Sequence, residues 1–364
     1  MTRKRLSILA GFLMIVSLNL SACAGAGAPE AEEPAIDKVA FFHGGSIADE
    51  GWDMLHHEAM LAIEEKYPNL ETEFVENQPY SADGTRALEQ LATDGADIIF
   101  VTTEYADIVY EAAANHPETI FIECNGHKAE DNVSWWYVRH WDPSYLIGMA
   151  AGLMSETDKL GFIGPFPYSS VYASVNAFQL GARSVNPDAE TTAVLVNSWF
   201  DPAAERQAAE ALADSGVDMI FGIMNGAAYL EAAEELGIMA AMWTVDMREF
   251  GPNAYISSIE VDWVPYHLKI TEQIMDGTFD PTKPLLMPIG QGVDRDDWGQ
   301  DVPQEVRDQV DAVRAKMLSG EFNPWVGRIS DASGTLRVAE GEELSELFLY
   351  QEWDWAVEGV VGLP

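Results

Sequence analysis

The sequence predicts an α/β protein made of two lobes, each a doubly wound parallel sheet with helices on both faces. Two observations support this fold class. Short apolar runs typical of buried strands alternate with segments whose apolar residues recur at helical spacing, first from Val39 and again from Tyr145. The body from Lys38 to Pro364 is also long enough for two domains. Strict alternation is typical of parallel sheets, because a crossover helix must connect neighbouring strands.

The first lobe is expected to span residues 38–140, with a return segment near residues 260–290. Apolar runs predict its strands over residues 39–43, 72–75, 97–101, 119–122 and 133–137. Helical spacing of apolar residues predicts the intervening helices near residues 52–67, 87–92 and 108–114.

The second lobe is expected to span residues 141–258 and to repeat this alternation. A nearly all-apolar helix over 145–154 is short enough to indicate a core helix and not a membrane span. Further helices are expected over 171–182 and from near Asp201 and Gly226; Asp201 is suited to cap its helix, with Pro202 in the first turn. The expected strands cover residues 160–163, 192–196, 219–221 and 239–242.

Residues 288–364 are expected to form a C-terminal extension that packs on the lobes. Pro303 to Lys316 has the pattern of an amphipathic helix, with valines recurring on one face. The aromatic segment from Trp353 to Trp355 is expected to pack into the core.

The N-terminus has the pattern of a lipoprotein signal peptide over residues 1–22. Basic residues at positions 3–5 precede an apolar stretch too short for a comfortable membrane span. It ends in Leu-Ser-Ala-Cys at residues 20–23, which resembles the bacterial lipobox, in which the cysteine thiol receives diacylglycerol. Residues 23–37 are small, acidic and proline-containing, and indicate a flexible tether. We therefore expect a lipid anchor on Cys23 at the extracytoplasmic face of the cell membrane; the alternative is an ordinary signal peptide with an incidental cysteine.

Charge and cysteine content exclude several classes of function. The chain has 60 acidic and 20 basic residues, so it should repel nucleic acids and anionic lipid headgroups. Besides Cys23 the only cysteine is Cys124, which excludes a disulfide framework and a cysteine-based zinc site once Cys23 carries lipid. Cys124 is expected to be a buried or half-buried structural thiol. No cofactor and no metal are expected.

Residues that follow the predicted strands are the candidates for ligand binding, because ligands of open α/β sheets lie beyond the carboxyl ends of the strands. Two facing lobes would place these ends across one cleft. The segments are rich in aromatic, amide and acidic side chains, which suit a planar heterocycle that stacks on aromatic faces. The candidates are Asp49, Trp52, Glu104, Tyr105, Trp199, Asn225, Trp243 and Asp246. For Asp49 the alternative is a helix cap.

An enzyme is not expected. The sequence has no Gly-x-Ser-x-Gly motif, and Gly44-Gly45 is not followed by the Gly-Lys-Ser/Thr of a phosphate-binding loop. His56-His57-Glu58 fails the spacing of a zinc protease, because Leu61 stands where the second histidine ligand is required. Both histidines are expected on the surface of their helix.

Several stretches together resemble the basic membrane protein family of ABC-transporter solute-binding lipoproteins. The similarity covers residues 38–362. The stretches that carry it are Asp49-Glu-Gly-Trp52, Asn176 to Asp188, Val196-Asn-Ser-Trp-Phe-Asp-Pro202, Asp246-Met-Arg-Glu-Phe-Gly-Pro252, Asp276-Gly-Thr-Phe279, Gly320-Glu-Phe-Asn-Pro324 and Trp353 to Val360. The resemblance implies a type I periplasmic-binding-protein fold and a purine or related heterocycle that is bound between the lobes and delivered to an ABC permease. The chain is expected to be a monomer.

The sequence departs from the nucleoside-binding branch of that family. That branch has a Phe-Asn pair in the first loop and an Asp-Ser-Asp loop that holds the ribose, whereas this chain has Gly51-Trp52 and Thr244-Val245-Asp246. The chain is more similar to the branch that binds free purine bases, although Asn225 replaces a usually acidic residue there. The resemblance therefore implies a base such as adenine or guanine. A nucleoside, another heterocycle such as riboflavin, and a ligand sensor for a signalling partner stay as alternatives.

Roles for these residues follow as a hypothesis. Trp52 and Trp199 would supply one aromatic face from each lobe, and Trp243 or Tyr105 would close the pocket. The edge of the base would be read by Glu104, Asn225 and Asp246.

Overall fold

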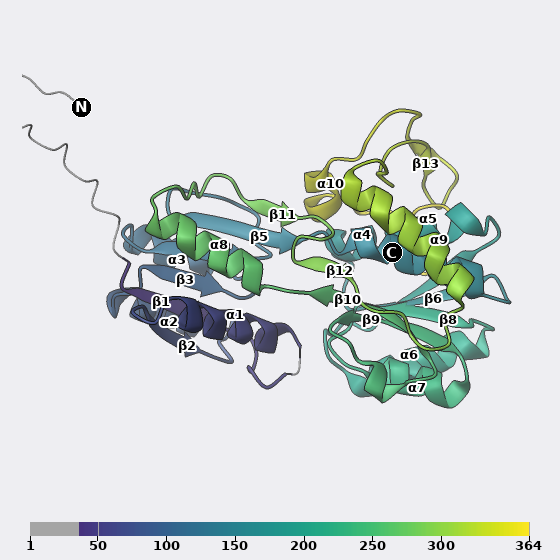
Figure 1. Ribbon diagram of the computed structural model, residues 1–364, viewed down its shortest axis with the longest axis horizontal. Helices are drawn as coiled ribbons and strands as arrows, with labels where there is room; N and C mark the ends of the chain where they lie inside the picture. Colours follow the sequence, from purple (N-terminus) through teal and green to yellow (C-terminus); the bar gives the residue numbers. More distant parts are fainter. Residues whose placement is uncertain (1–35, 50, 364) are drawn as a thin grey trace, which may run out of the picture. The chain divides into compact units, whose positions relative to one another are not determined.

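The computed structural model describes residues 36–49 and 51–363. The predicted signal peptide, the predicted lipidation site Cys23 and most of the predicted tether lie outside the described residues. The described chain contains two large sheets with helices on both faces of each, and one small two-stranded sheet (Figure 1).

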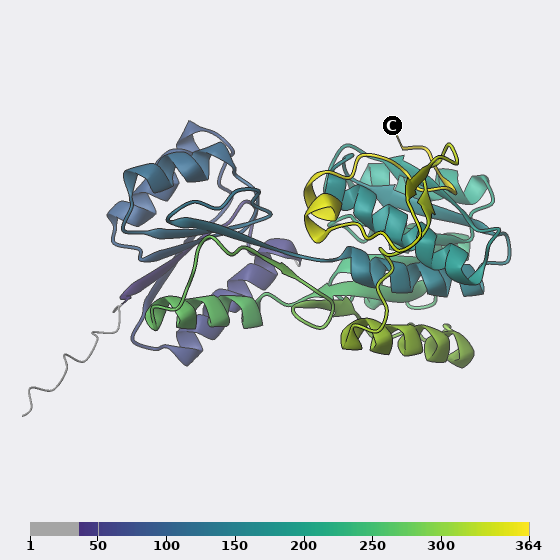
Figure 2. The ribbon, with the colours of Figure 1, turned by 90° about the horizontal axis from the view of Figure 1, so that it is seen from above.

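The first lobe is built on a sheet with the strand order β11-β5-β4-β3-β1-β2, in which all the pairs are parallel. Helices α1 and α8 pack together on one face, and α2 and α3 pack together on the other (Figure 2). The elements are β1 (Lys38–Phe42), α1 (Trp52–Lys66), β2 (Glu71–Val75), α2 (Ala82–Thr93), β3 (Ile98–Val101), α3 (Asp107–Asn115), β4 (Ile120–Cys124), β5 (Val133–Val138), α8 (Val264–Met275) and β11 (Leu285–Met287).

The second lobe is built on a sheet with the order β12-β10-β9-β8-β6-β7-β15, parallel except for the antiparallel pair β10–β12. Helices α4 and α5 pack on one face, and α6 and α7 on the other (Figure 1). The elements are α4 (Trp141–Met154), β6 (Lys159–Gly164), α5 (Ser169–Val185), β7 (Glu190–Leu195), α6 (Pro202–Asp214), β8 (Met219–Gly222), α7 (Ala228–Leu236), β9 (Met239–Thr244), a 3-10 turn (Arg248–Phe250), β10 (Tyr255–Val261), β12 (Val293–Arg295) and β15 (Val360–Val361).

The chain passes between the lobes at several points. It leaves the first sheet after β5, returns after β10 to form α8 and β11, and crosses again to β12. The interlobe connection therefore consists of adjacent strand-to-helix and strand-to-strand segments, an arrangement through which two lobes can rotate about a hinge.

The C-terminal part lies against the second lobe. Helix α9 (Gln304–Ser319) packs on α4, and its buried residues Val306 and Val310 belong to the face that the sequence predicts. It is followed by β13 (Ile329–Ser330), β14 (Leu336–Val338) and α10 (Glu346–Gln351), which packs on α5. Trp353 is fully buried, as expected, and packs edge-to-face on Trp325.

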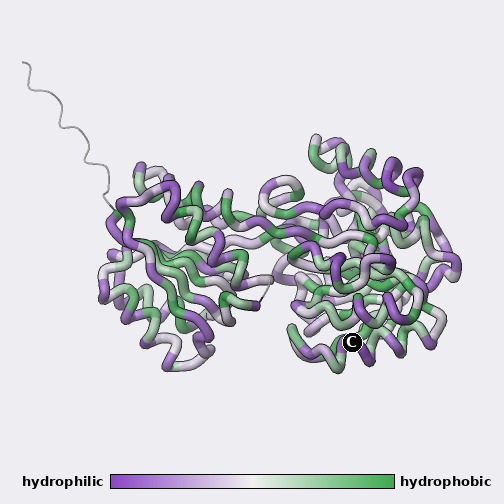
Figure 3. The backbone as a smooth tube through the Cα atoms, turned by 60° about the horizontal axis from the view of Figure 1, so that its bottom comes forward, coloured by the Kyte–Doolittle hydropathy of each residue, from purple (hydrophilic) through white to green (hydrophobic). Residues whose placement is uncertain are grey.

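Apolar residues concentrate in the strands and on the inner faces of the helices, as the hydropathy-coloured tube shows (Figure 3). Helix α4 is buried over nearly its whole length because α5, α9 and strands of the second sheet all pack on it, which explains its nearly all-apolar sequence. Among the residues that the structure describes, no helix is both long and apolar enough to cross a bilayer. The predicted fold class is confirmed.

One local expectation was wrong. His56 is fully buried instead of lying on the surface of α1, and its ring stacks on Trp263 at a centroid distance of 4.8 Å. Burial lowers the pKa of His56 well below its usual range, with smaller contributions from His267 and His43. The cause is α8, which covers this face of α1 although it lies some two hundred residues later in the chain.

Candidate functional site

A cavity of about 830 Å³ lies between the two lobes, within the size range of small-molecule sites. Nearly every segment that lines it follows the carboxyl end of a parallel strand or forms that end, as expected for open α/β sheets. The lining residues are Gly44, Gly45, Asp49, Trp52, Asp53, Gln78, Tyr80, Thr103, Glu104, Tyr105, Asn125, His127, Tyr137, Pro167, Tyr168, Ser169, Ser170, Trp199, Asn225, Trp243, Tyr350 and Gln351.

Trp52 begins α1 and is half-buried at the cavity wall. Its indole N–H donates to the carbonyl of Thr102 at 2.7 Å, which fixes the ring and leaves its faces, not its polar edge, for contacts. One face meets Trp243 of the second lobe at a centroid distance of 6.3 Å and an interplanar angle of 26°. A planar ligand between them would need roughly 7 Å for two van der Waals contacts, so these two rings contact each other across the lobes.

Trp199 forms the aromatic wall on the second lobe. It lies in the segment between β7 and α6 and is half-buried. Its ring stacks on Tyr168 at a centroid distance of 6.5 Å with 28° between the planes. Its carbonyl accepts from the backbone N–H of Asn225 at 2.9 Å, which ties neighbouring cavity segments together. Phe166 packs against the same indole ring at 6.4 Å.

The carboxylates in the cavity are largely engaged by the protein. Asp53 is 6% exposed; it accepts from the Thr102 hydroxyl at 2.8 Å and the Gly45 N–H at 2.9 Å, and contacts His43 Nδ1 at 3.1 Å. Asp49 accepts from the N–H groups of residues 51, 53 and 54, at 3.0 Å each, so it also caps α1. These hydrogen bonds hold the first loop in place.

Glu104 is exposed and lies 3.3 Å from Nε2 of His127. The hydrogen bond to Glu104 raises the pKa of His127 above its usual value, although partial burial opposes this shift. Both side chains line the cavity, so the pair forms a charged or strongly polar corner of it.

Tyr105 is held from behind by a buried glutamate. Oε1 of Glu123 accepts from the backbone N–H groups of Tyr105 at 2.6 Å and Ala106 at 2.7 Å, just before α3 begins. Glu123 is fully buried, and desolvation raises its pKa to about 7 despite these two hydrogen bonds. The Tyr105 ring packs edge-to-face on Phe42 and stacks on Tyr80, so its position is fixed by the core of the first lobe.

Asn225 and Asn125 have side-chain amide groups in the cavity lining that are free for hydrogen bonding. The side chain of Asn225 makes no hydrogen bond with any residue that the structure describes. The side-chain oxygen of Asn125 receives only a weak contact from the Cys124 thiol at 3.8 Å. Cys124 itself is buried and free, as the sequence analysis expected.

Unusual backbone geometry borders the cavity. Positive φ angles occur at Ala106 (41°), Asn125 (63°), Asn197 (57°) and Thr244 (74°). For a β-branched residue such as Thr244 this region is strongly disfavoured. Strained backbone of this kind gathers at ligand sites, where the surrounding structure enforces it.

Seven of the eight predicted ligand-binding residues line this one cavity, and Asp246 does not. Asp246 pairs instead with Arg248 at 2.6 Å, and Arg248 in turn pairs with Asp296 at 2.7 Å. Sequence reasoning did not single out Asp53, His127, Tyr137, Tyr350 or Gln351. Asn125 and Tyr168 were within strand-end segments that it did consider.

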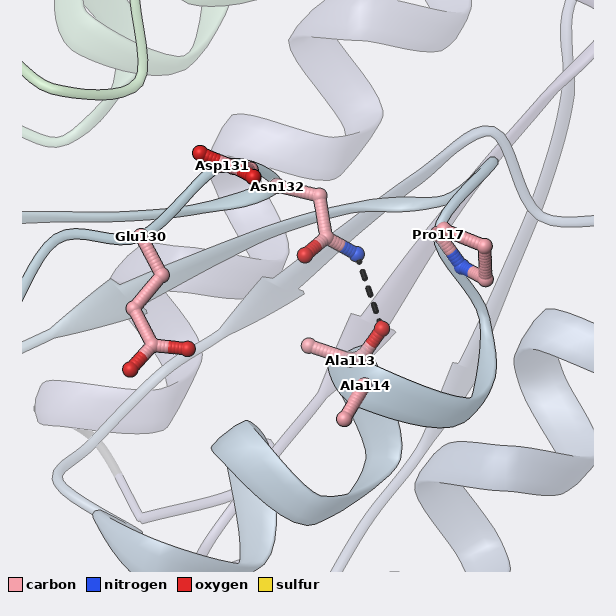
Figure 4. Close-up of a pocket in the computed structure, with 6 residues that line it drawn as sticks. All are labelled: Ala113, Ala114, Pro117, Glu130, Asp131 and Asn132. Atoms are coloured by element: carbon pink, nitrogen blue, oxygen red, sulfur yellow. Dashed lines mark hydrogen bonds between the residues drawn. The ribbon is translucent and has the colours of Figure 1, made fainter.

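A second hollow of about 480 Å³ lies on the first lobe, beside the end of α3 (Figure 4). Its amide, Asn132, donates to the carbonyls of Ala113, His116 and Thr119, each at 3.0 Å. Glu130 and Asp131 point away from that amide (Figure 4). The hollow therefore has no convergent set of free polar groups and no aromatic face.

Comparison with known proteins agrees with the geometry. The family model described as "ABC transporter substrate-binding protein PnrA-like" matches residues 36–319. A candidate ABC transporter glucose-binding protein of Haloferax volcanii is 36% identical over 326 residues, which cover 89% of this chain and 80% of the relative. A purine-binding protein of Brucella abortus is 33% identical over 322 residues, which cover 88% of this chain and 91% of the relative.

Solved structures share the fold. An ABC transporter solute-binding protein from Conexibacter woesei aligns with a TM-score of 0.65 at 21% identity and covers 79% of this chain and 98% of its own. One from Aeropyrum pernix aligns with a TM-score of 0.66 at 14% identity and covers 79% of this chain and 92% of its own. Two lobes of this fold around a lined cavity, together with the family match over most of the chain, place the protein in the Bmp family of PnrA-like ABC transporter substrate-binding proteins.

Proposed function

We propose that the interlobe cavity binds a free purine base, such as adenine or guanine, for delivery to an ABC permease. The observation that carries this proposal is which polar groups of the cavity lack a hydrogen-bond partner within the protein. Asp49 and Asp53 are engaged in backbone and side-chain hydrogen bonds, whereas the side-chain amide of Asn225 is not, and the exposed ring of Tyr168 lines the cavity beside Trp199. A flat ligand with a few donors and acceptors on its edge fits such a set.

Aromatic faces and amides complement the two parts of a purine. Stacking of a base on an aromatic side chain contributes about 1–3 kcal/mol, and an Asn side chain can bond the edge of adenine through two hydrogen bonds. In this cavity Trp199 and Tyr168 offer the aromatic faces from one lobe, and Asn225 lies beside them, bonded to Trp199 through its backbone. The relative from Brucella abortus, named as a purine-binding protein, supports the same ligand class.

A hexose is the second candidate, because the Haloferax volcanii relative carries glucose binding in its name. A sugar also stacks on aromatic rings, but its many hydroxyl groups each need a partner when they are buried. Because Asp49 and Asp53 already accept hydrogen bonds from the protein, fewer acceptors remain for those hydroxyls. We therefore favour the base over the sugar.

The test is a thermal-shift and calorimetric titration of the purified chain with adenine, guanine, adenosine, guanosine, riboflavin and D-glucose. A ligand that binds only the folded state raises the melting temperature by mass action, with about 2.7 kcal/mol of stabilisation at one hundred times its Kd. We expect a clear rise with a free base and a smaller one with its nucleoside. A rise with D-glucose and none with the purines would replace the proposed ligand by a sugar, and a rise with nucleosides alone would replace the base by its nucleoside.

We also propose that Cys23 carries a lipid anchor. The support is the lipobox-like sequence at residues 20–23 and the flexible composition that follows it. When the full chain is expressed in a bacterial host supplied with radiolabelled palmitate, the wild type should take up the label and partition with membranes. Cys23→Ser should lose both properties, and Cys124→Ser should retain them. Equal labelling of wild type and Cys23→Ser would contradict the anchor.

A further inference from the structure

The cavity has a wall that comes from the far C-terminus. Tyr350 and Gln351 line it, and both belong to α10, beyond residue 319 where the family match ends. Helix α10 lies on the side of the second lobe that faces the first (Figures 1 and 2).

The segment around α10 is firmly attached to the second lobe. The amide of Asn176, itself fully buried, donates to the carbonyl of Trp355 and accepts from the N–H of Val357, both at 2.9 Å. Strand β15 then extends the second sheet by parallel pairing with β7. Leu349 of α10 is fully buried. The helix must therefore move with the second lobe.

Another side of the same helix contacts the first lobe. The hydroxyl of Tyr350 donates to the carbonyl of Gly126 at 3.0 Å, and its ring stacks on His127 at a centroid distance of 5.3 Å with only 9° between the planes. The ring also packs on Trp135 and Tyr137, each at 5.3 Å. Glu346 pairs with Arg139, and the Gln351 amide N–H donates to the His127 carbonyl at 3.3 Å.

The lobes are connected covalently by the hinge segments, whereas the contacts of α10 with the first lobe are noncovalent and can break. Tyr350 is 4% exposed, so rotation of the lobes away from each other would break its hydrogen bond and expose its ring to water. Tyr350 also borders the cavity, so the same rotation would remove part of the cavity wall. The amide oxygen of Gln351 accepts no hydrogen bond from any residue that the structure describes, and it is available to a donor group of the ligand.

We propose that α10 is part of the ligand site. Tyr350 supplies a wall that exists only when the lobes are closed, so it ties ligand retention to closure, and Gln351 helps to select the ligand through its amide oxygen. The role of Tyr350 is independent of the ligand's identity, whereas the expected effect of Gln351 on adenine rests on the proposed purine function.

The test compares the wild-type chain with Tyr350→Phe, Tyr350→Ala and Gln351→Leu. Leu347→Ala is the matched control, because Leu347 lies on the same helix and is 48% exposed. We expect Kd for adenine to rise about two- to tenfold in Tyr350→Phe, as for loss of one hydrogen bond. A larger rise, through faster dissociation, is expected in Tyr350→Ala, and no change beyond twofold in Leu347→Ala. Gln351→Leu should weaken adenine more than unsubstituted purine, which lacks the amino group.

A second readout needs no ligand. Hydrogen exchange of residues 125–137 should become faster in Tyr350→Ala and stay unchanged in Leu347→Ala. Unchanged adenine affinity in folded Tyr350→Ala would overturn the inference. If the wild-type chain does not bind adenine, the purine proposal fails, and the role of Tyr350 is tested with whichever compound of the titration panel does bind. Weaker binding of that compound by Tyr350→Ala supports the inference, and unchanged affinity in the folded variant overturns it.

Discussion

Replacing Trp199 by alanine is expected to weaken adenine binding by about 1–3 kcal/mol, or roughly five- to 150-fold in Kd. The indole is half-buried at the cavity wall, and its ring contacts are with Phe166 and Tyr168 of a neighbouring strand-end segment. Its removal therefore deletes a stacking face while the core of the second lobe stays intact. Isothermal titration with adenine measures the loss, and thermal unfolding without ligand measures any change in stability.

The matched control is Phe200→Ala. Phe200 is the next residue in the same segment, is 62% exposed, and does not line the cavity. It should bind adenine within twofold of the wild type. A Trp199→Ala variant that is folded and binds adenine as tightly as the control would exclude Trp199 as a stacking face and would weaken the case for a planar ligand.

The fold was predictable because its signals are local. Strand and helix periodicity lies within each segment, and Asp201 caps α6 as its sequence context predicts, by accepting from the N–H of Ala204 at 3.0 Å. The place of the cavity could be predicted from the strand ends, because parallel strands bring their carboxyl ends to the same edge of the sheet whatever the details of packing. This rule predicted that Trp52, Trp199 and Asn225, which belong to separate elements, line one cavity.

What sequence reasoning missed depends on long-range packing. His56 is buried by α8, and the wall formed by Tyr350 is brought in by α10; neither helix is near its partner in the sequence. Asp246 follows β9 as the rule requires, yet the cation that neutralises it, Arg248, is only two residues away and holds it outside the cavity lining. A position directly after a strand fixes where the backbone of a residue lies, but it does not determine which partner the side chain contacts.

The burial of Glu123 should make the free energy of unfolding fall as the pH rises. Desolvation raises its folded-state pKa to about 7 from the ordinary 4.5. Between these two values the unfolded chain has released the proton and the folded chain still holds it, so folding is favoured by protonation in this window. The contribution is fully present below pH 4.5 and is lost as the pH rises through about 7. At 1.36 kcal/mol per unit, this loss is about 3 kcal/mol.

Glu123→Gln tests this directly, because glutamine has the same shape and cannot ionise. Its carbonyl oxygen can still accept from the N–H groups of Tyr105 and Ala106. We expect the free energy of unfolding of the wild type, from urea titrations, to fall by about 3 kcal/mol more than that of the variant between pH 4.5 and pH 8. Glu58→Gln, which changes an exposed glutamate of α1, should follow the wild-type pH dependence. Parallel curves for wild type and Glu123→Gln would show that folding does not raise the pKa of Glu123 and would contradict the prediction.

Glu123→Leu separates the charge from the hydrogen bonds. Leucine removes the ionisation and also leaves the two backbone N–H groups before α3 without an acceptor, at a cost of about 1–3 kcal/mol for each. This variant should therefore be less stable than Glu123→Gln at every pH, and it should bind ligand more weakly because the Tyr105 wall loses its anchor. If the glutamine variant keeps wild-type affinity and the leucine variant does not, Glu123 acts on the site through position and not through charge.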